Sequence, residues 1–360
     1  MHLPKIALIV SVLLAGCEKP PVKEPVRSIA TIDRNQVIQI ADQLKQHAAS
    51  NRVDLTKEVA ALQAATNRFL ASPDEQHLST LQLSWQSAHE AYTRAQFGFL
   101  TLDEERRQLI YRIDAWPVQP GFIDDLPLYP GSGIINDETL ILSPEVLISQ
   151  HGITDEEEVS LGFHAMEYLI FARPLSDFIP FSTPDFERDS KQGTGLQQVE
   201  RRRQFLAIVA TQLVNDTDSM FVACAGQFDI EDYPEALNVL KQVLKGNLQK
   251  LRMAFRESNL VTTTDAGHST FSGTSLLTLK SEIDSLEQFM ITKVPMETIL
   301  RAVDPNAYTN FRATLLELNK LLMESDEDEV SRANLPLLLS ALIHELESFD
   351  RMLIHQLPAN

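Results

Sequence analysis

Apolar residues between Arg34 and Leu70 recur at intervals of three and four, and this spacing constrains the fold more than any other feature of the chain. Such spacing places side chains on one face of an α-helix, which must then pack against another apolar surface. Ser72-Pro73-Asp74 ends the pattern, because proline cannot continue a helix. The apolar positions include Val37, Ile40, Ala41, Leu44 and Ala48.

Similar patterns recur along the chain, and only 13 of its 360 residues are glycine. They predict an all-α fold of two helical domains of the four-helix-bundle type. We place the N-terminal bundle at residues 31–180, with a long loop inside it, and the C-terminal bundle at residues 181–360. The further predicted helices span 75–99, 104–111, 196–228, 234–256, 275–289, 305–324 and 332–356.

The first residues, "MHLPKIALIVSVLLAGC", have the form of a bacterial lipoprotein signal. The apolar run from Ile6 to Leu14 is too short to span a bilayer, and Leu14-Ala15-Gly16-Cys17 fits a lipobox. We expect cleavage after residue 16, lipid on Cys17 and a Pro-rich tether over 17–30. The pattern is typical of a cell-envelope lipoprotein, and Glu18 favours the outer membrane, facing the periplasm. A plain secretory signal is the alternative.

Charge and cysteine content narrow the possible partners and the source of stability. The formal net charge of −19 disfavours nucleic acid and anionic lipid and is compatible with cations. Only Cys17 and Cys224 are present, so with Cys17 lipidated no intramolecular disulfide is possible. We interpret Cys224 as a small buried hydrophobic residue. Stability must therefore come from burial of apolar surface.

A predicted loop over residues 121–153 precedes the most unusual helix of the sequence. A loop of this length in a helical protein is usually functional or disordered, and its isoleucines and aromatic residues disfavour disorder. Thr154 followed by Glu157 resembles a capping box, which predicts that a helix starts there.

The stretch "LGFHAMEYLIFARP", Leu161 to Pro174, has His164 and Glu167 as the titratable groups of an otherwise apolar run. On a helix the two side chains point to the same side, and their neighbours leave no polar face. A buried carboxylate needs a partner. The pattern alone leaves two interpretations open, a structural His-Glu pair or two ligands of a metal site.

Five segments resemble the imelysin family of bacterial envelope proteins, which includes imelysin-like proteins and iron-regulated protein A. "GFHAMEYLIF" resembles the family's GxHxxE signature, with Gly162, His164 and Glu167 matching it residue by residue. Together the segments span Leu83 to Leu286. The other four are "LSWQSAHEAYTRAQFGF", "RIDAWPVQPGFID", "SGIIN" and "HSTFSGTSLLTLKSEIDSL".

The resemblance implies two bundles related by approximate duplication, with the signature at their interface, and a role in iron uptake. Where many members carry an acidic residue this chain has His268, whose imidazole could itself bind a metal. Tryptophans near loops also plug core edges, and Asp or Asn residues also cap turns, so structural roles stay open for the pocket residues. The residues expected to shape a ligand pocket are Trp85, Asp114, Trp116, Asp124, Asn136, His268, Ser269 and Ser272.

Some family members have been classed as metallopeptidases, but the known protease patterns are absent from this sequence. His89-Glu90 and His344-Glu345 both lack the second histidine of a zincin, and Tyr168 stands where an inverzincin has histidine. No Glu lies three residues before a His, as ferritin-type di-iron bundles require. We interpret the second His-x-x-Glu, at His344, as part of a solvated helix face.

The hypothesis from the sequence is a lipid-anchored protein that binds a metal or metal-containing ligand at the interface of the bundles. His164 and Glu167 would bind or orient a divalent or ferric ion, with iron favoured. Components of envelope iron transport are the expected protein partners. One alternative is a metallopeptidase of the imelysin type, and another is a scaffold that binds a polysaccharide or protein without metal.

Overall fold

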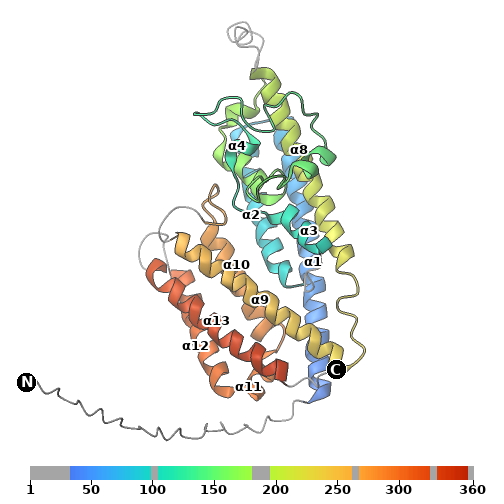
Figure 1. Cartoon of the computed structure of the whole chain (residues 1–360), viewed down its shortest axis with the longest axis vertical. Coiled ribbons are helices and arrows are strands. Elements are labelled where there is room, and N and C mark those ends of the chain that lie inside the picture. Colours follow the sequence, from blue (N-terminus) through green and yellow to red (C-terminus); the bar gives the residue numbers. More distant parts are fainter. Residues whose placement is uncertain (1–32, 99–103, 181–194, 262–266, 325–330, 356–360) are drawn as a thin grey trace, which may run out of the picture.

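The computed structural model describes residues 33–98, 104–180, 195–261, 267–324 and 331–355. Within these ranges the chain is helical and contains no β-strand, which confirms the predicted all-α fold (Figure 1). No helix of this part is long and apolar enough to cross a membrane. The predicted signal peptide, the lipidation site Cys17 and the tether lie outside the described residues.

One group of helices surrounds a first hydrophobic core. Most of its members are long amphipathic helices, and short helical turns cover one end of the group (Figure 1). The helices of this group are α1 (Arg34–Ala71), α2 (Glu75–Ala95), η1 (Gln96–Gly98), α3 (Glu104–Asp114), α4 (Pro120–Ile123), α5 (Pro144–Gln150), α6 (Gly162–Glu167), η2 (Tyr168–Ala172), η3 (Leu175–Phe178) and α8 (Gly195–Ala223).

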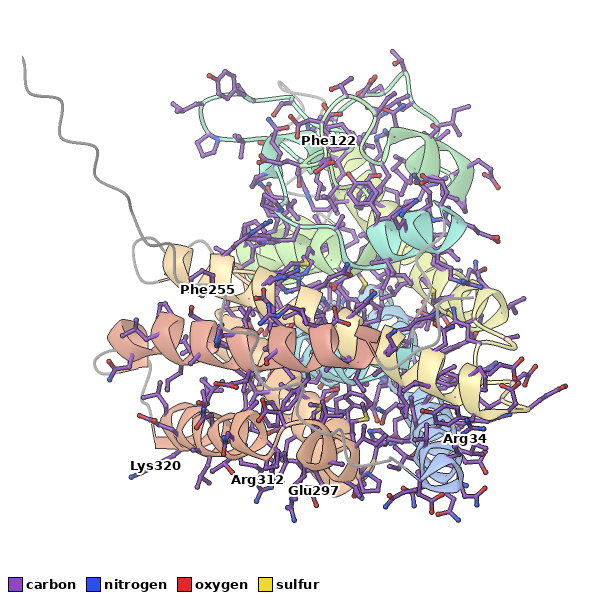
Figure 2. All side chains as sticks on the ribbon, turned by 60° about the horizontal axis from the view of Figure 1, so that its bottom comes forward. Arg34, Phe122, Phe255, Glu297, Arg312 and Lys320 are labelled. Atoms are coloured by element: carbon purple, nitrogen blue, oxygen red, sulfur yellow. The ribbon has the colours of Figure 1, made fainter. Side chains whose placement is uncertain are left out.

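The remaining helices surround a second hydrophobic core. Arg312 and Lys320 are exposed on its outer helix α12, where they reach into solvent (Figure 2). The helices are α9 (Tyr233–Val261), α10 (Ser275–Glu287), η4 (Gln288–Thr292), α11 (Glu297–Val303), α12 (Pro305–Glu324) and α13 (Ser331–His355).

Helix α1 belongs to both cores. Its N-terminal part, from Val37 to Leu44, is buried with α9 and its neighbours, whereas its C-terminal part, from Leu55 to Phe69, is buried with α2 and α8. Helix α8 also packs in the first core, through residues such as Phe205. In this grouping α8, which lies after position 181, packs in the first core, and α1, which lies before it, packs in both. The division at 180/181 stays a prediction.

Two helices continue into a π-helical turn, α6 into η2 and α10 into η4. Each turn is followed by a basic residue, Arg173 and Lys293, and then by a proline within two residues. This local likeness agrees with the approximate duplication that the family resemblance implies. The duplication itself stays a prediction.

The predicted helix start at Thr154 is wrong. The Glu158 carboxylate accepts hydrogen bonds from the backbone N–H and the hydroxyl of Thr154, both at 2.7 Å, and so closes a turn. The helix begins eight positions later, at Gly162, whose φ of +83° starts it in a conformation that suits glycine. The side chain that bonds Thr154 is that of Glu158, one position after the Glu157 of the apparent capping box, so the pattern closes a turn and does not start a helix.

Two of three consecutive arginines of α8 hold the long loop onto the first core, and the third joins two other helices. Arg201 donates hydrogen bonds to four backbone carbonyls of the loop, those of Ile134, Ile135, Asp137 and Leu140. Arg202 binds the buried carboxylate of Asp124, and Arg203 binds the carbonyls of Phe178 and Leu70. The loop is thus ordered by side-chain donors instead of by strands or long helices.

We predict that Arg201→Ala lowers the free energy of unfolding by about 1–3 kcal/mol, because several loop carbonyls lose their donor. Urea denaturation followed by circular dichroism measures the change. Arg312→Ala, at the exposed position on α12, is the matched control and should change stability by less than about 0.5 kcal/mol. Equal stabilities of the two variants would show that Arg201 does not hold the loop.

Candidate metal centre

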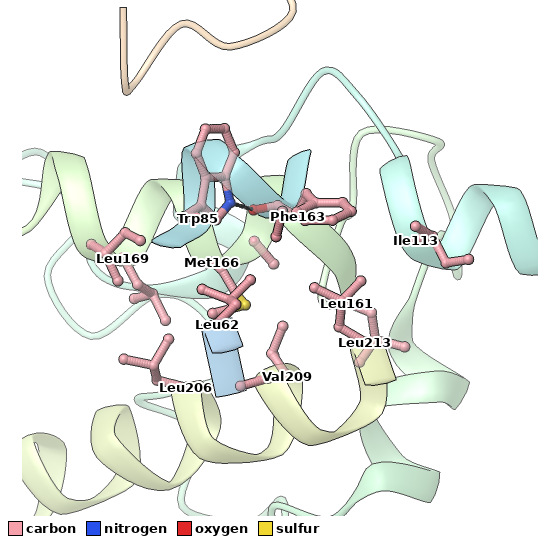
Figure 3. Close-up of a cluster of buried hydrophobic side chains, with 14 of the residues drawn as sticks. Leu62, Trp85, Ile113, Leu161, Phe163, Met166, Leu169, Leu206, Val209 and Leu213 are labelled. Atoms are coloured by element: carbon pink, nitrogen blue, oxygen red, sulfur yellow. Dashed lines mark hydrogen bonds between the residues drawn. The ribbon is translucent and has the colours of Figure 1, made fainter. Parts of the chain in front are cut away.

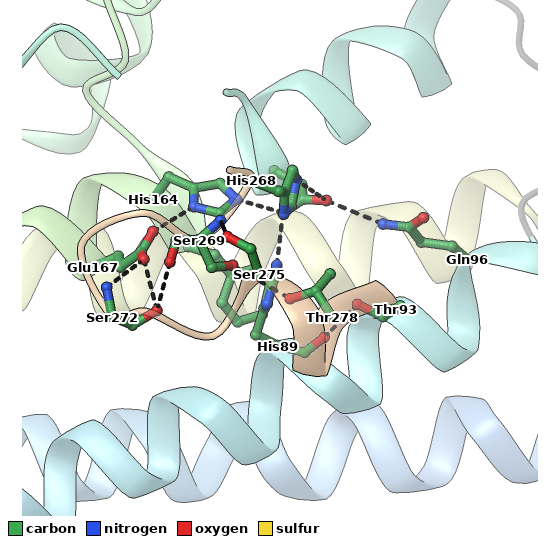
Figure 4. A network of polar contacts seen from close by, with 12 residues as sticks. His89, Thr93, Gln96, His164, Glu167, His268, Ser269, Ser272, Ser275 and Thr278 are labelled. Atoms are coloured by element: carbon green, nitrogen blue, oxygen red, sulfur yellow. Dashed lines mark hydrogen bonds and ion pairs between the residues drawn. The ribbon is translucent and has the colours of Figure 1, made fainter. Parts of the chain in front are cut away.

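Four side chains from four separate segments converge between the helices (Figure 4). His89 lies on α2, Asp114 is the last residue of α3, His164 lies on α6, and His268 lies in the turn before α10. One possible ligand atom of each lies within 4.8 Å of the corresponding atoms of the other three. All four side chains are at least 86% buried, because the most exposed, His268, is 14% accessible.

Gly162 allows α6 to approach the end of α3 closely. A Cβ atom at this position would collide with the carbonyl oxygens of Arg112 and Ile113, directly before Asp114. The signature glycine therefore has two physical roles, a positive φ and a close backbone contact. This contact brings His164 of α6 next to the carboxylate of Asp114, with 3.3 Å between Nε2 and Oδ1.

The rest of α6 is anchored in the first core. Phe163 and Met166 are buried there, and the Trp85 indole N–H donates a hydrogen bond of 2.8 Å to the Phe163 carbonyl (Figure 3). The Trp85 ring also stacks on His89, with ring centroids 5.0 Å apart. Trp85 thus positions two of the four residues, one through its N–H and one through its ring.

Glu167 supports His164 from outside the cluster. Its Oε2 lies 2.7 Å from Nδ1 of His164, and its Oε1 accepts hydrogen bonds from Ser272, at 2.9 Å from the backbone N–H and 2.7 Å from the hydroxyl. A carboxylate on the far nitrogen of a histidine is the usual orienting partner of a metal ligand. We predicted that Glu167 either binds the ion or orients a ligand. The geometry supports the orienting role.

Asp114 lies at the middle of the three imidazoles. Its Oδ1 is 3.2 Å from Nε2 of His89, and its Oδ2 accepts a hydrogen bond of 3.0 Å from Gln96 and lies 3.8 Å from Nε2 of His268. The rings of His164 and His268 are nearly perpendicular, at 87°, with centroids 4.4 Å apart. The cluster thus presents three nitrogen donors around one carboxylate.

The electrostatics of the cluster follow from burial and close charges. Burial would raise the pKa of the Asp114 carboxyl, but His268, His164 and His89 hold it well below its usual range. Burial would lower the pKa of His164, but the carboxylates of Asp114 and Glu167 raise it to about 9. Burial, with the positive charge of His164, lowers the pKa of His268 to about 3. These shifts favour the charged form of His164 and the neutral form of His268.

The donor set fits a transition-metal ion. Nε2 of His164 makes no hydrogen bond that meets the geometric criteria among the described residues, and the Asp114 carboxylate lies near it, at 3.3 Å, so this nitrogen is placed to bind a cation beside that carboxylate. A metal bonded at about 2.0–2.2 Å keeps tetrahedral ligand atoms about 3.3–3.6 Å apart, so the side chains must move closer together around the ion. His89, Asp114, His164 and His268 are the residues that would hold the ion.

Most of the residues predicted from the sequence meet at this site. Trp116 lies beside His268, with ring centroids 5.9 Å apart, and Ser269 is buried, with its hydroxyl 3.3 Å from that of Thr278. Asn136 instead donates a hydrogen bond to Asp124, which binds Arg202 at 2.5 Å. The structure therefore separates these two from the cluster and gives them a part in holding the loop.

His89 is the residue that the sequence prediction missed, because its His-Glu pair was tested only as half of a zincin motif. A signal was present in its spacing, since Trp85 and His89 are four residues apart and share one face of α2. A histidine that is buried on the same face as a tryptophan points into the protein. That argument does not by itself say which segments it meets.

A buried cluster of three histidines and one aspartate, built from two adjoining groups of helices, defines a helical protein with a candidate metal centre. The sequence profile of the Imelysin family matches residues 47–347, so the chain belongs to the imelysin family. This confirms the resemblance found in the sequence. None of the curated proteins compared with the chain matches it.

Two solved structures show the same fold at low sequence identity. A putative iron-regulated protein A precursor from Parabacteroides distasonis has 13% identity and a TM-score of 0.61, over 91% of this chain and 97% of that chain. An imelysin-like protein from Psychrobacter arcticum has 13% identity and a TM-score of 0.52, over 89% of this chain and 94% of that chain. At this identity the likeness shows the fold alone.

We predict that Gly162→Ala destabilises the protein by about 2 kcal/mol or more, because the new Cβ is strained at positive φ and collides with the end of α3. Thermal and urea unfolding measure the loss. The matched control is Gly246→Ala, inside α9, where a Cβ meets nothing within 4 Å. That variant should gain about 0.5–1 kcal/mol. Similar effects of the two substitutions would refute the close-contact role.

We predict that the metal-free protein loses stability as the pH rises through about 9, the folded pKa of His164. This raised pKa stabilises the fold fully below the unfolded value of about 6.5, and the contribution disappears as the folded group loses its proton. Melting temperatures between pH 6.5 and 9.5, with a chelator present, measure the slope. His164→Gln should flatten the slope and His344→Gln, on an exposed face of α13, should retain it. An unchanged slope in His164→Gln would contradict the assignment.

Proposed function

We propose that this protein binds one transition-metal ion at the cluster of His89, Asp114, His164 and His268, in an iron-related role in the bacterial cell envelope. The observation that carries the proposal is the convergence of four buried side chains whose possible ligand atoms all lie within 4.8 Å of one another. A polar cluster of this kind is costly to bury unless a ligand completes it. The name of one structural neighbour, an iron-regulated protein A precursor, supports iron as one of the ions.

The lipobox at Cys17 supports anchoring by lipid, and we propose an outer-membrane location facing the periplasm. In this setting the protein would take up metal, or a metal-containing ligand, and pass it to components of envelope iron transport. The strongly negative net charge supports a cationic ligand.

The geometry supports metal binding more than it supports hydrolysis of a peptide bond. A metallopeptidase needs a free base beside its metal-bound water. Glu167, the carboxylate of the signature, has both oxygens engaged, one by His164 and one by Ser272. Asp114 lies among the imidazoles and would itself bind the ion. Neither carboxylate is therefore placed as a general base.

We predict that the purified, tag-free protein binds one metal ion per chain and that His89→Ala and His164→Ala abolish tight binding. Glu167→Gln should weaken binding by about 10–100-fold, because it disturbs the orientation of His164 without removing a donor. Equilibrium dialysis with elemental analysis measures both effects for Fe²⁺, Cu²⁺ and Zn²⁺. His344→Ala, on the exposed face of α13, is the matched control and should bind like the wild type.

Two outcomes would overturn this proposal. Absence of binding, with an unchanged melting temperature in iron, copper or zinc, would favour the metal-free scaffold. Metal-dependent cleavage of an unfolded polypeptide that is lost in His164→Ala would favour the metallopeptidase. Stabilisation by metal is the expected result and should reach about 2.7 kcal/mol when the free ion is at about 100 times its Kd.

A further inference from the structure

We infer that His268 makes this centre selective for a divalent borderline cation, Fe²⁺, Cu²⁺ or Zn²⁺, against Fe³⁺. The inference rests on the proposed function, since it names the class of ion that the same four residues take. It also narrows the expectation from the sequence, which left both divalent and ferric ions open. The steps are the chemistry of the donors, the charge of the site and the position of His268.

The donors are rich in nitrogen. Three of the four are imidazoles, from His89, His164 and His268, and Asp114 supplies the carboxylate. The second carboxylate in contact with the cluster, Glu167, is occupied by His164 and Ser272. Imidazole suits divalent iron, copper, nickel and zinc, whereas oxygen donors suit harder ions. The small, highly charged Fe³⁺ is the hardest of the candidate ions.

The charge of the site also favours a divalent ion over Fe³⁺. Asp114 and Glu167 carry two negative charges when both are ionised, which balance a divalent ion bound to neutral imidazoles. Both carboxylates are buried, Glu167 with only 1% of its side chain accessible. A trivalent ion would leave one positive charge uncompensated among these groups, which is costly away from water. The site is therefore balanced for a charge of two.

His268 is the residue that decides both properties. It reaches the cluster from the turn before α10, and its ring packs between those of His89 and Trp116, with centroids 5.4 Å and 5.9 Å away. A carboxylate at this position would give two imidazoles and two carboxylates, with a third negative charge counting Glu167. A harder, trivalent ion would then be favoured. The three other donors would be unchanged by such a replacement.

The test compares wild type, His268→Asp and His268→Gln with the matched control His344→Asp. Competition titrations give the affinities for Zn²⁺ and Cu²⁺, for Fe²⁺ without oxygen, and for Fe³⁺ supplied as its nitrilotriacetate complex. We expect the wild type and His344→Asp to bind the divalent ions more tightly than Fe³⁺. His268→Asp should weaken Zn²⁺ and Cu²⁺ by about 10–100-fold and strengthen Fe³⁺, while His268→Gln should weaken the divalent ions without strengthening Fe³⁺.

The outcomes separate the two proposals. If the wild type binds no metal, the proposed function fails, and this inference fails with it. If the wild type binds metal but prefers Fe³⁺, or if His268→Asp folds and keeps the wild-type order of affinities, only the inference is overturned. Circular dichroism shows whether each variant folds. If a variant does not fold, the order of metal affinities of the wild type still decides the inference. In the wild type, Co²⁺ should give the strong visible absorption of a four-coordinate site.

Discussion

The burial of α1 in both hydrophobic cores is the constraint on which the rest of the structure depends. One continuous helix packs against α2 and α8 along its C-terminal part and against α9 along its N-terminal part. Because the helix does not break between them, the two groups are fixed at a constant distance along its axis (Figure 1). The turn that carries His268 and Ser272 can therefore meet α6 from the opposite group. A cluster drawn from four segments needs this shared frame.

Much of the fold could be predicted, because a helix records its buried face in its spacing. The limits of α1 and α12 agree with the sequence to within a residue, since proline or an Asn/Asp cap marks their ends. The start of α6 could not be predicted. It depends on a turn closed by Glu158 and on the contact of Gly162 with α3, and both require knowledge of the surrounding structure. The roles of the α8 arginines could not be predicted for the same reason, as most of their partners are backbone carbonyls and the carboxylate partner of Arg202, Asp124, lies 78 positions away.

The site residues that belong to a sequence motif could be predicted, whereas those that only the three-dimensional fold brings together could not. His164 and Glu167 were recognisable because two titratable groups in an apolar run must have partners. That His164 is the ligand and Glu167 its orienting partner depends on Ser272, about a hundred positions away, which donates a hydrogen bond to one oxygen of Glu167. His89 carries no motif that distinguishes it from a core histidine. Asp124 and Asn136 show the converse case, in which residues of family-like segments hold the loop, since Asp124 binds Arg202 of α8 and Asn136 donates a hydrogen bond to Asp124.

The preorganisation of the centre explains how so many polar groups are tolerated in an apolar interior. Glu167, Gln96 and the indole of Trp85 are each engaged in holding a ligand residue or the backbone beside one. These contacts fix Asp114 and His164 within the cluster, where the ring centroid of His164 lies 4.4 Å from that of His268. Burying so many polar groups costs stability in the metal-free protein, and the network keeps the ligand atoms close together. A cation then gains affinity because less reorganisation remains to be done when it binds.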